Sequence, residues 1–319
     1  MLGPLILIFI QFVCLLEGVP MLHDFENNEI ENELDLNELS HNFSREPNEE
    51  SGRNVELWDE NSGVNPEELG NYLEGDIMMT PRMAKNGLSD KDMLWKNGII
   101  PYEISGHFTT ADVDLIKRAM GVYHKYTCIR FVPRKSSDKD YISIQSGYTG
   151  CWSSVGRMTG RQEVNLQTPS CTRKLGTVLH ELMHVCGFYH EQNRPERDFY
   201  VTVYFQNIKS GHQRNFEKAS LKETNDFGVP YDYRSVMHYS GNAFSRNGNP
   251  TIVPKDPKGE GKIGQREGFS KGDLLKLNAM YKCPNTLPGK YSILDQENHF
   301  GGESNFITTL LNKFDYNHL

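Results

Sequence analysis

Apolar and polar residues alternate in this chain with helical and strand periods, mostly between residues 95 and 283. The stretch TTADVDLIKRAMGVYHKYT (109–127) begins with two threonines that can cap a helix, and it repeats apolar residues at three- and four-residue steps. A second amphipathic helix is predicted in SKGDLLKLNAMYKC (270–283), and a third begins near Arg173. Strands are predicted in GIIPYEIS (98–105), YISIQSG (141–147) and EVNLQ (163–167).

The first residues have a different pattern. An apolar run from Leu5 to Leu16 is too short to span a bilayer and suits a secretory signal peptide cut between Gly18 and Pro20. A buried core helix is the weaker alternative, because the acidic stretch that follows gives it nothing to pack against. No later apolar run is long enough to span, so the product is expected to be soluble and secreted, with no membrane anchor.

Charge divides the rest of the chain, although the formal net charge of -8 is ordinary. From Asp24 to Asp76 there are 17 Asp and Glu against two basic residues, whereas from Asn86 onward there are 30 Lys and Arg against 24 Asp and Glu. Residues 23–70 contain few apolar side chains and are expected not to order themselves. Asn42, in NFS, is a possible glycosylation acceptor.

The sequence contains six cysteines. Cys14 would leave with the signal peptide, so an odd number remains for an oxidising compartment. Two disulfides and one free thiol are the simplest arrangement, and spacing alone leaves open which cysteine is free.

The stretch HELMHVCGFYH (180–190) predicts a metal site. On a helix, His180 and His184 lie on one face and can bind one zinc ion, while Glu181 is turned away from the ligands. Gly187 can end the helix in a left-handed conformation, and the chain can then return His190 as a third ligand. A pair of surface histidines is the alternative for the short motif, but the full spacing favours zinc.

Three imidazoles leave a fourth position for water, which is typical of a catalytic zinc site. The pKa of that water falls from about 16 toward about 7. Glu181 can accept its proton as general base, and the hydroxide can attack a polarised carbonyl carbon.

The extended motif, together with HEQNRPERD (190–198) and SVMHY (235–239), resembles the astacin family of metzincin zinc proteases. The resemblance runs from about Leu73 to Cys283, with Glu196 as one departure where the family usually has Asp. It implies that Met237 packs in a turn beneath the metal. It also implies that Tyr239 binds zinc in the resting enzyme and later donates a hydrogen bond to the oxyanion. Ordinary core packing is the alternative for both residues.

The same resemblance implies a precursor. Asn86 would be the mature N-terminus, released by a trypsin-like cut after Lys85, and its buried amine would contact Glu191. YLEGDI (72–77) resembles the family's propeptide motif, in which Asp76 would occupy the open position of the zinc and keep the precursor silent.

The resemblance also implies the disulfides Cys128–Cys283 and Cys151–Cys171, leaving Cys186 as a buried free thiol, with a redox or intermolecular role as the alternative. The substrate would pair with an edge strand in CWSSVG (151–156), which includes Trp152. Arg266 would favour an acidic side chain just after the scissile bond, with a solvated surface arginine as the alternative.

We therefore expect an α+β fold in two lobes, with a twisted, mostly parallel sheet and two long helices, a mostly irregular second lobe, and the zinc cleft between them. The expected parts are a signal peptide (1–19), an acidic propeptide (20–85), the protease domain (86–283) and a tail (284–319). The predicted function is a secreted zinc endopeptidase, a monomer that cleaves proteins or peptides and has no nucleic-acid partner. The alternatives are a catalytically inactive, secreted binding protein on the same fold and another kind of metzincin with a different substrate pocket.

Overall fold

The computed structural model describes residues 46–79, 91–219 and 225–284. The predicted signal peptide, Asn42, Lys85 and Asn86 lie outside the described residues, as does the tail beyond residue 284.

A five-stranded sheet organises the fold, in the order β2-β1-β3-β5-β4. Four neighbouring strands run parallel, and β4 pairs antiparallel with β5 at one edge. The sheet is therefore mostly parallel, as expected. In β3, four successive side chains are buried, which is typical of a strand covered on both faces. The strands are β1 (Ile99–Ile104), β2 (Arg130–Pro133), β3 (Tyr141–Gln145), β4 (Cys151–Ser153) and β5 (Arg161–Leu166).

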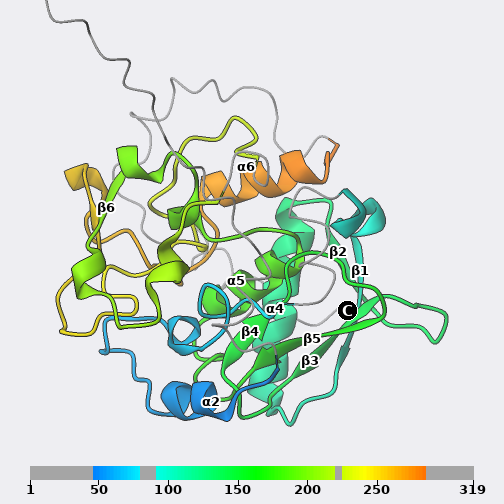
Figure 1. The fold of residues 1–319 in the computed structure, drawn as a ribbon. Helices are drawn as coiled ribbons and strands as arrows, with labels where there is room; N and C mark the ends of the chain where they lie inside the picture. Colours follow the sequence, from blue (N-terminus) through cyan, green and yellow to red (C-terminus); the bar gives the residue numbers. More distant parts are fainter. Residues whose placement is uncertain (1–45, 80–90, 220–224, 285–319) are drawn as a thin grey trace, which may run out of the picture. The chain divides into compact units, whose positions relative to one another are not determined.

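Two helices pack with this sheet, α4 (Thr110–Tyr126) and α5 (Leu175–Val185) (Figure 1). The side chain of Thr109 caps α4 by accepting a hydrogen bond from the Asp112 backbone N–H at 3.2 Å. Inside the core, the Tyr123 hydroxyl donates to the Leu179 carbonyl at 2.8 Å and ties α4 to α5. The helix predicted at 109–127 and the histidine helix are both present.

The described chain beyond α5 is less regular, as expected, and consists of short strands, single turns and one α-helix, α6 (Lys271–Met280). The strands β6 (Val201–Val203) and β7 (Ile252–Pro254) form a second, two-stranded sheet that the sequence pattern did not reveal. The disulfide Cys128–Cys283 joins the chain just after α6 to the chain just before β2. The short 3₁₀ helices are η1 (Pro66–Leu69), η2 (Lys91–Met93), η3 (Lys96–Gly98), η4 (Glu191–Asn193), η5 (Arg197–Phe199), η6 (Phe205–Asn207), η7 (Gln213–Phe216) and η8 (Pro257–Gly259).

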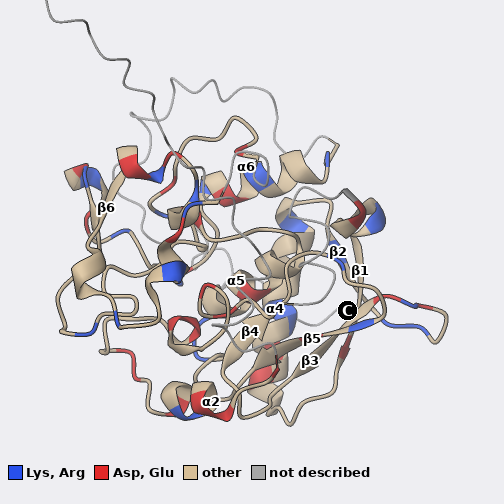
Figure 2. Cartoon of the chain, in the orientation of Figure 1, with Lys and Arg blue, Asp and Glu red and all other residues tan. Residues whose placement is uncertain are grey.

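The expectation of disorder was wrong for residues 46–70, which pack against the rest of the chain and include the helix α2 (Glu49–Glu56). Val55 is fully buried, and its carbonyl accepts a hydrogen bond from the Ser170 hydroxyl at 2.9 Å. The Tyr72 hydroxyl donates to the Thr149 carbonyl at 2.8 Å. These partners lie about a hundred residues away, so the acidic composition of the segment did not predict its order. Figure 2 shows charges of both signs along the described chain, α2 included.

Candidate metal centre

Three imidazoles converge where α5 ends. His180 and His184 lie one turn apart on α5, and the Gly187 backbone has a φ of +110°, which lets the chain turn back. His190 follows this turn as the residue before η4. The Nε2 atom of His180 lies 3.1 Å from that of His184 and 3.3 Å from that of His190.

The opposite nitrogen of each ring has an oxygen acceptor. The Nδ1 atom of His180 lies 2.8 Å from the Val236 carbonyl, and that of His184 lies 2.7 Å from the Phe188 carbonyl. In His190 the acceptor is a carboxylate, Glu74, at 2.6 Å. Oxygen acceptors require the Nδ1 atoms to donate, so each imidazole in its neutral form presents the Nε2 lone pair to the centre of the cluster.

Asp76 closes the cluster from residues 46–79, here called the N-terminal segment. One carboxylate oxygen lies 2.9 Å from His180 Nε2 and 3.4 Å from His190 Nε2, and the other lies 3.4 Å from His184 Nε2. That second oxygen, Oδ1, is buried and has no hydrogen-bond partner among the described residues.

These donors fit a metal ion. Lone pairs and a carboxylate that face one another at such distances repel unless a cation lies between them. The four ligand atoms lie within 4.8 Å of one another, and three imidazoles with one carboxylate match the number and kind of ligands that zinc prefers. His180, His184, His190 and Asp76 thus form a site for one zinc ion.

The charge of the cluster agrees with this assignment. For His190, burial is the largest influence and lowers the pKa, but the negative charges of Asp76 and Glu74 outweigh it and raise the pKa to about 9. For His180, burial and then the positive charge of Arg266 lower the pKa to about 4. The two carboxylates therefore favour positive charge at the centre of the site.

Glu181, the predicted general base, is fully buried and is not one of the four residues whose ligand atoms cluster. Its Oε2 accepts a hydrogen bond from the Ser153 hydroxyl at 2.9 Å, and its Oε1 has no partner among the described residues. Among the protein groups, burial is the largest influence and, with the negative charges of Asp76 and Glu67, it raises the pKa of Glu181 well above its ordinary value.

Met237 and Tyr239 are both buried near the histidines. The Met237 carbonyl accepts a hydrogen bond from the Glu191 backbone N–H at 3.1 Å, which places the turn directly against the residue after the third histidine. The Tyr239 ring centre lies 4.6 Å from that of His190, but its hydroxyl donates to the Glu74 carbonyl at 2.6 Å. In this structure the phenol thus contacts the N-terminal segment.

Glu191, for which the resemblance implied a contact with the mature N-terminus, has two cationic partners from its own domain. Its Oε2 lies 2.5 Å from Lys276 Nζ on α6, and its Oε1 lies 2.9 Å from Arg194 Nη1. Burial, the largest influence, raises its pKa, but the two cations outweigh burial and lower the pKa overall.

The N-terminal segment also covers the predicted substrate residues. The Ser153 N–H donates to the Asp76 carbonyl, and the Ser153 carbonyl accepts from the Met78 N–H, both at 2.9 Å, so the segment pairs with β4. Trp152 is buried, with its ring centre 5.9 Å from that of Tyr72.

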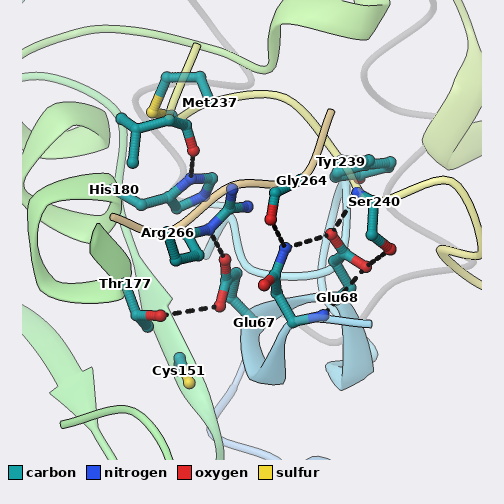
Figure 3. Close-up of polar contacts among 12 residues, drawn as sticks. Glu67, Glu68, Cys151, Thr177, His180, Met237, Tyr239, Ser240, Gly264 and Arg266 are labelled. Carbon is teal, nitrogen blue, oxygen red and sulfur yellow. Dashed lines mark hydrogen bonds and ion pairs between the residues drawn. The ribbon is translucent and has the colours of Figure 1, made fainter. Parts of the chain in front are cut away.

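Arg266 is buried and forms an ion pair with Glu67 of the N-terminal segment (Figure 3). With this segment in place, Arg266 is not a solvated surface arginine, because Glu67 and backbone carbonyls surround the guanidinium.

The cysteines are arranged as the resemblance implied. Disulfides join Cys128 to Cys283 and Cys151 to Cys171, and Cys186 is the one free cysteine among the described residues. Burial raises the pKa of the Cys186 thiol well above its ordinary value, so the thiolate that would react is disfavoured.

Several residues of the site were not found from the sequence. Glu67, Glu68 and Glu74 looked like solvated acids of a polar segment, and Ser153 was only part of an expected edge strand. The one available signal was the position of Glu74, two residues before Asp76 in the propeptide-like motif.

Comparison with known proteins places this geometry in a known group. The model of the astacin peptidase family matches residues 87–282. The chain is 42% identical over 219 residues to zinc metalloproteinase nas-7 of Caenorhabditis elegans, covering 69% of this chain and 56% of that protein. It is 45% identical over 199 residues to nas-15 of the same organism, covering 62% and 34%. The chain thus spans about half or less of the length of these relatives.

A solved structure agrees with the sequence comparison. High choriolytic enzyme 1, a hatching-enzyme zinc protease from Oryzias latipes (medaka fish), matches with a TM-score of 0.54 and 38% sequence identity. The match covers 65% of this chain and all of that one.

Proposed function

Because the chain belongs to the astacin family of zinc metalloproteinases, we propose that it is a zinc endopeptidase made as an inactive precursor. The observation that carries the proposal is the site of three histidines closed by Asp76 from the N-terminal segment. The proposed parts are a signal peptide (1–19), a propeptide (20–85), a protease domain (86–283) and a tail (284–319).

The proposed chemistry is hydrolysis of a peptide bond. His180, His184 and His190 would hold zinc, which would polarise the substrate carbonyl and lower the pKa of a water molecule to about 7. Glu181 accepts the proton of the attacking water and passes it to the leaving amine as general acid. The Ser153 hydroxyl, 2.9 Å from the Glu181 carboxylate, holds this base in place.

Tyr239 would stabilise the oxyanion that forms during attack. Its hydroxyl donates to the Glu74 carbonyl in the precursor, so the departure of the N-terminal segment would free this donor. Met237 would support the ligands in two ways. Its buried side chain packs in the core, and its carbonyl accepts a hydrogen bond from the N–H of Glu191, the residue that follows His190.

Latency would follow from two contacts of one segment. Asp76 would supply a fourth ligand to zinc in place of the water that the reaction needs. Residues 76–78 pair with β4, where an extended substrate would otherwise add as a strand. A trypsin-like cut after Lys85 would release the segment, and the new amine at Asn86 would then join the buried charges around Glu191.

Substrate selection is assigned to the surface that the segment covers. Trp152 on β4 would contact the substrate beside the cleaved bond, and Arg266 would bind an acidic side chain just after it. The substrates are proteins or peptides, and the protein acts as a monomer.

The family and the two disulfides indicate an extracellular protein, and the apolar run at residues 5–16 supports secretion. Among the described residues, none of the helices is both long and apolar enough to cross a membrane.

The test is peptide cleavage by the full-length precursor before and after limited trypsin treatment, with zinc quantified. We expect cleavage only after trypsin, and its loss in Glu181→Gln while about one zinc per chain remains. A correctly processed protein that holds zinc tightly but cleaves nothing would instead be a binding protein, and the mechanism above would be wrong.

A further inference from the structure

Two adjacent glutamates of the N-terminal segment, Glu67 and Glu68 in η1, are buried, with exposed fractions of 1% and 2%. Unpaired carboxylates are rarely buried this deeply, because removing a charge from water is costly. Glu67 pairs with Arg266 and Glu68 with Ser240, which lie 199 and 172 positions further along the chain (Figure 3).

Glu67 fills a site built around Arg266. The Arg266 Nε donates to Glu67 Oε1, and both side chains are completely buried. The Arg266 Nη1 donates to the carbonyls of Gln265 at 2.8 Å and His238 at 3.2 Å, and the Thr177 hydroxyl lies 3.5 Å from Glu67 Oε2. Its Nη2 has no hydrogen-bond partner among the described residues, so the site offers one more donor than Glu67 uses.

The backbone holds this arginine rigidly. The Gly176 N–H donates to the Arg266 carbonyl at 3.0 Å, and a Cβ at Gly176 would lie 2.2 Å from that carbonyl group. The guanidinium thus lies between two backbone carbonyls, which accept from its Nη1, and one carboxylate, which accepts from its Nε. Pre-organised cation sites of this kind bind carboxylates well, because little side-chain entropy is lost.

Glu68 anchors the same turn at a neighbouring point. Its carboxylate accepts hydrogen bonds from the Ser240 N–H at 2.7 Å and the Ser240 hydroxyl at 2.5 Å. The Asn65 amide donates to Glu68 at 2.9 Å and to the Gly264 carbonyl at 3.1 Å. The turn 65–69 is thus bound by its own set of polar contacts.

We propose that Glu67 is an internal ligand of the Arg266 carboxylate site. This pair would be a second latch, that is, a contact separate from the metal that holds the N-terminal segment on the protease domain of the precursor. Asp76 closes the metal site while Glu67 fills the site that an acidic substrate side chain would use. This inference rests on the proposed release of the N-terminal segment. It predicts that the segment stays docked through Arg266 even when the metal is removed.

The first test is amide hydrogen exchange of residues 72–79 in the full-length precursor, with zinc and after chelation. In the chelated protein, Arg266→Met should increase opening of the segment roughly 100-fold, because it leaves a buried carboxylate unpaired. Glu67→Gln should increase opening roughly 10-fold, since a charged hydrogen bond becomes a neutral one. The double variant should open no more than Arg266→Met alone.

A matched control comes from the same segment. Glu60 forms a 2.7 Å ion pair with Arg173, but both side chains are about half exposed or more. Glu60→Gln should change opening less than about threefold, since exposed pairs contribute little. Exchange in β3 should be unchanged in every variant, and faster exchange there would mark loss of the fold. The proposal would be overturned if the increase in opening in the double variant equalled the product of the increases in Glu67→Gln and Arg266→Met. It would also be overturned if Glu67→Gln increased opening no more than Glu60→Gln does.

A second test uses the trypsin-activated protein and the synthetic peptide NSGVNPEELGNY (61–72), which lacks both Asp76 and Glu74. The peptide should inhibit cleavage of a substrate, and the version with Glu67→Gln should inhibit roughly tenfold less. Equal inhibition by the two peptides would contradict the second latch. If the effects of Glu67→Gln and Arg266→Met on exchange depend on each other but the activated protein cleaves nothing, the proposed activity is refuted and the Glu67–Arg266 contact is still supported.

Discussion

The buried ion pair between Lys276 and Glu191 offers a direct test of how α6 supports the metal centre. Lys276→Met removes the ammonium that lies 2.5 Å from the carboxylate, within a region where both side chains are at most 6% exposed. Breaking such a pair costs about 3–5 kcal/mol, because the remaining charge stays buried. Glu191 keeps Arg194 at 2.9 Å and the Asp232 N–H at 2.8 Å, so we expect the low end, about 3 kcal/mol.

Urea unfolding of the zinc-saturated precursor measures this loss of free energy, with constant slope as a check that the same surface unfolds. Lys117→Met is the matched control, since Lys117 is an exposed lysine on α4, and its effect should be within about 0.5 kcal/mol. The double variant Lys276→Met with Glu191→Gln should recover at least about 1 kcal/mol, because the buried Glu191 carboxylate that loses its ammonium partner is then also removed, while Arg194 keeps its ion pair with Glu196 at 2.5 Å. A loss below about 1 kcal/mol for the single variant would show that Arg194 alone compensates Glu191, and the reasoning would be refuted.

Three further predictions concern stability. A disulfide stabilises by restricting the unfolded chain, and more so when it closes a longer loop. Removing Cys128–Cys283, which spans 155 residues, should therefore cost about 5 kcal/mol in urea unfolding, and removing Cys151–Cys171, which spans 20, about 3 kcal/mol. A larger loss for Cys151–Cys171 would contradict this reasoning. Gly176→Ala should destabilise by at least ~2 kcal/mol, because its Cβ meets the Arg266 backbone, whereas Gly121→Ala in α4, with open space, should be neutral or stabilising in the same assay. Burial, and then the positive charge of Arg130, lower the pKa of His124 in the folded protein below its unfolded value of about 6.5. The neutral imidazole therefore contributes to stability in full above the unfolded pKa, and this contribution is lost as the pH falls through the lower folded pKa. His124→Gln should flatten the fall in Tm between pH 7 and pH 5, and an unchanged slope would exclude this histidine as the cause.

The sequence predicted the elements whose signals are local. The helix after Thr109 has a capping residue and regular apolar spacing within one segment, and the histidine helix has its ligands one turn apart. Such patterns depend on neighbours along the chain, so they survive without knowledge of the fold.

The acidic segment could not be predicted in the same way. The burial of Glu67 requires Arg266, which is 199 positions away, and the burial of Glu68 requires Ser240, which is 172 positions away. Composition alone gave the segment too few apolar residues to order itself. Its order comes from pairing with groups that only the folded domain presents together, and the sequence showed this only at Asp76, through the family resemblance.

The contacts of α6 have a consequence for the order of events during synthesis. Asp273 on α6 accepts hydrogen bonds from the Ser235 hydroxyl at 2.6 Å and the Val236 N–H at 2.9 Å, and the Val236 carbonyl in turn holds His180. His180 emerges from the ribosome almost a hundred residues before the helix that holds its Nδ1 partner, the Val236 carbonyl, in place. A nascent chain that stops short of α6 would therefore carry the metal motif without a firm metal site, so zinc capture should be among the last steps of biogenesis.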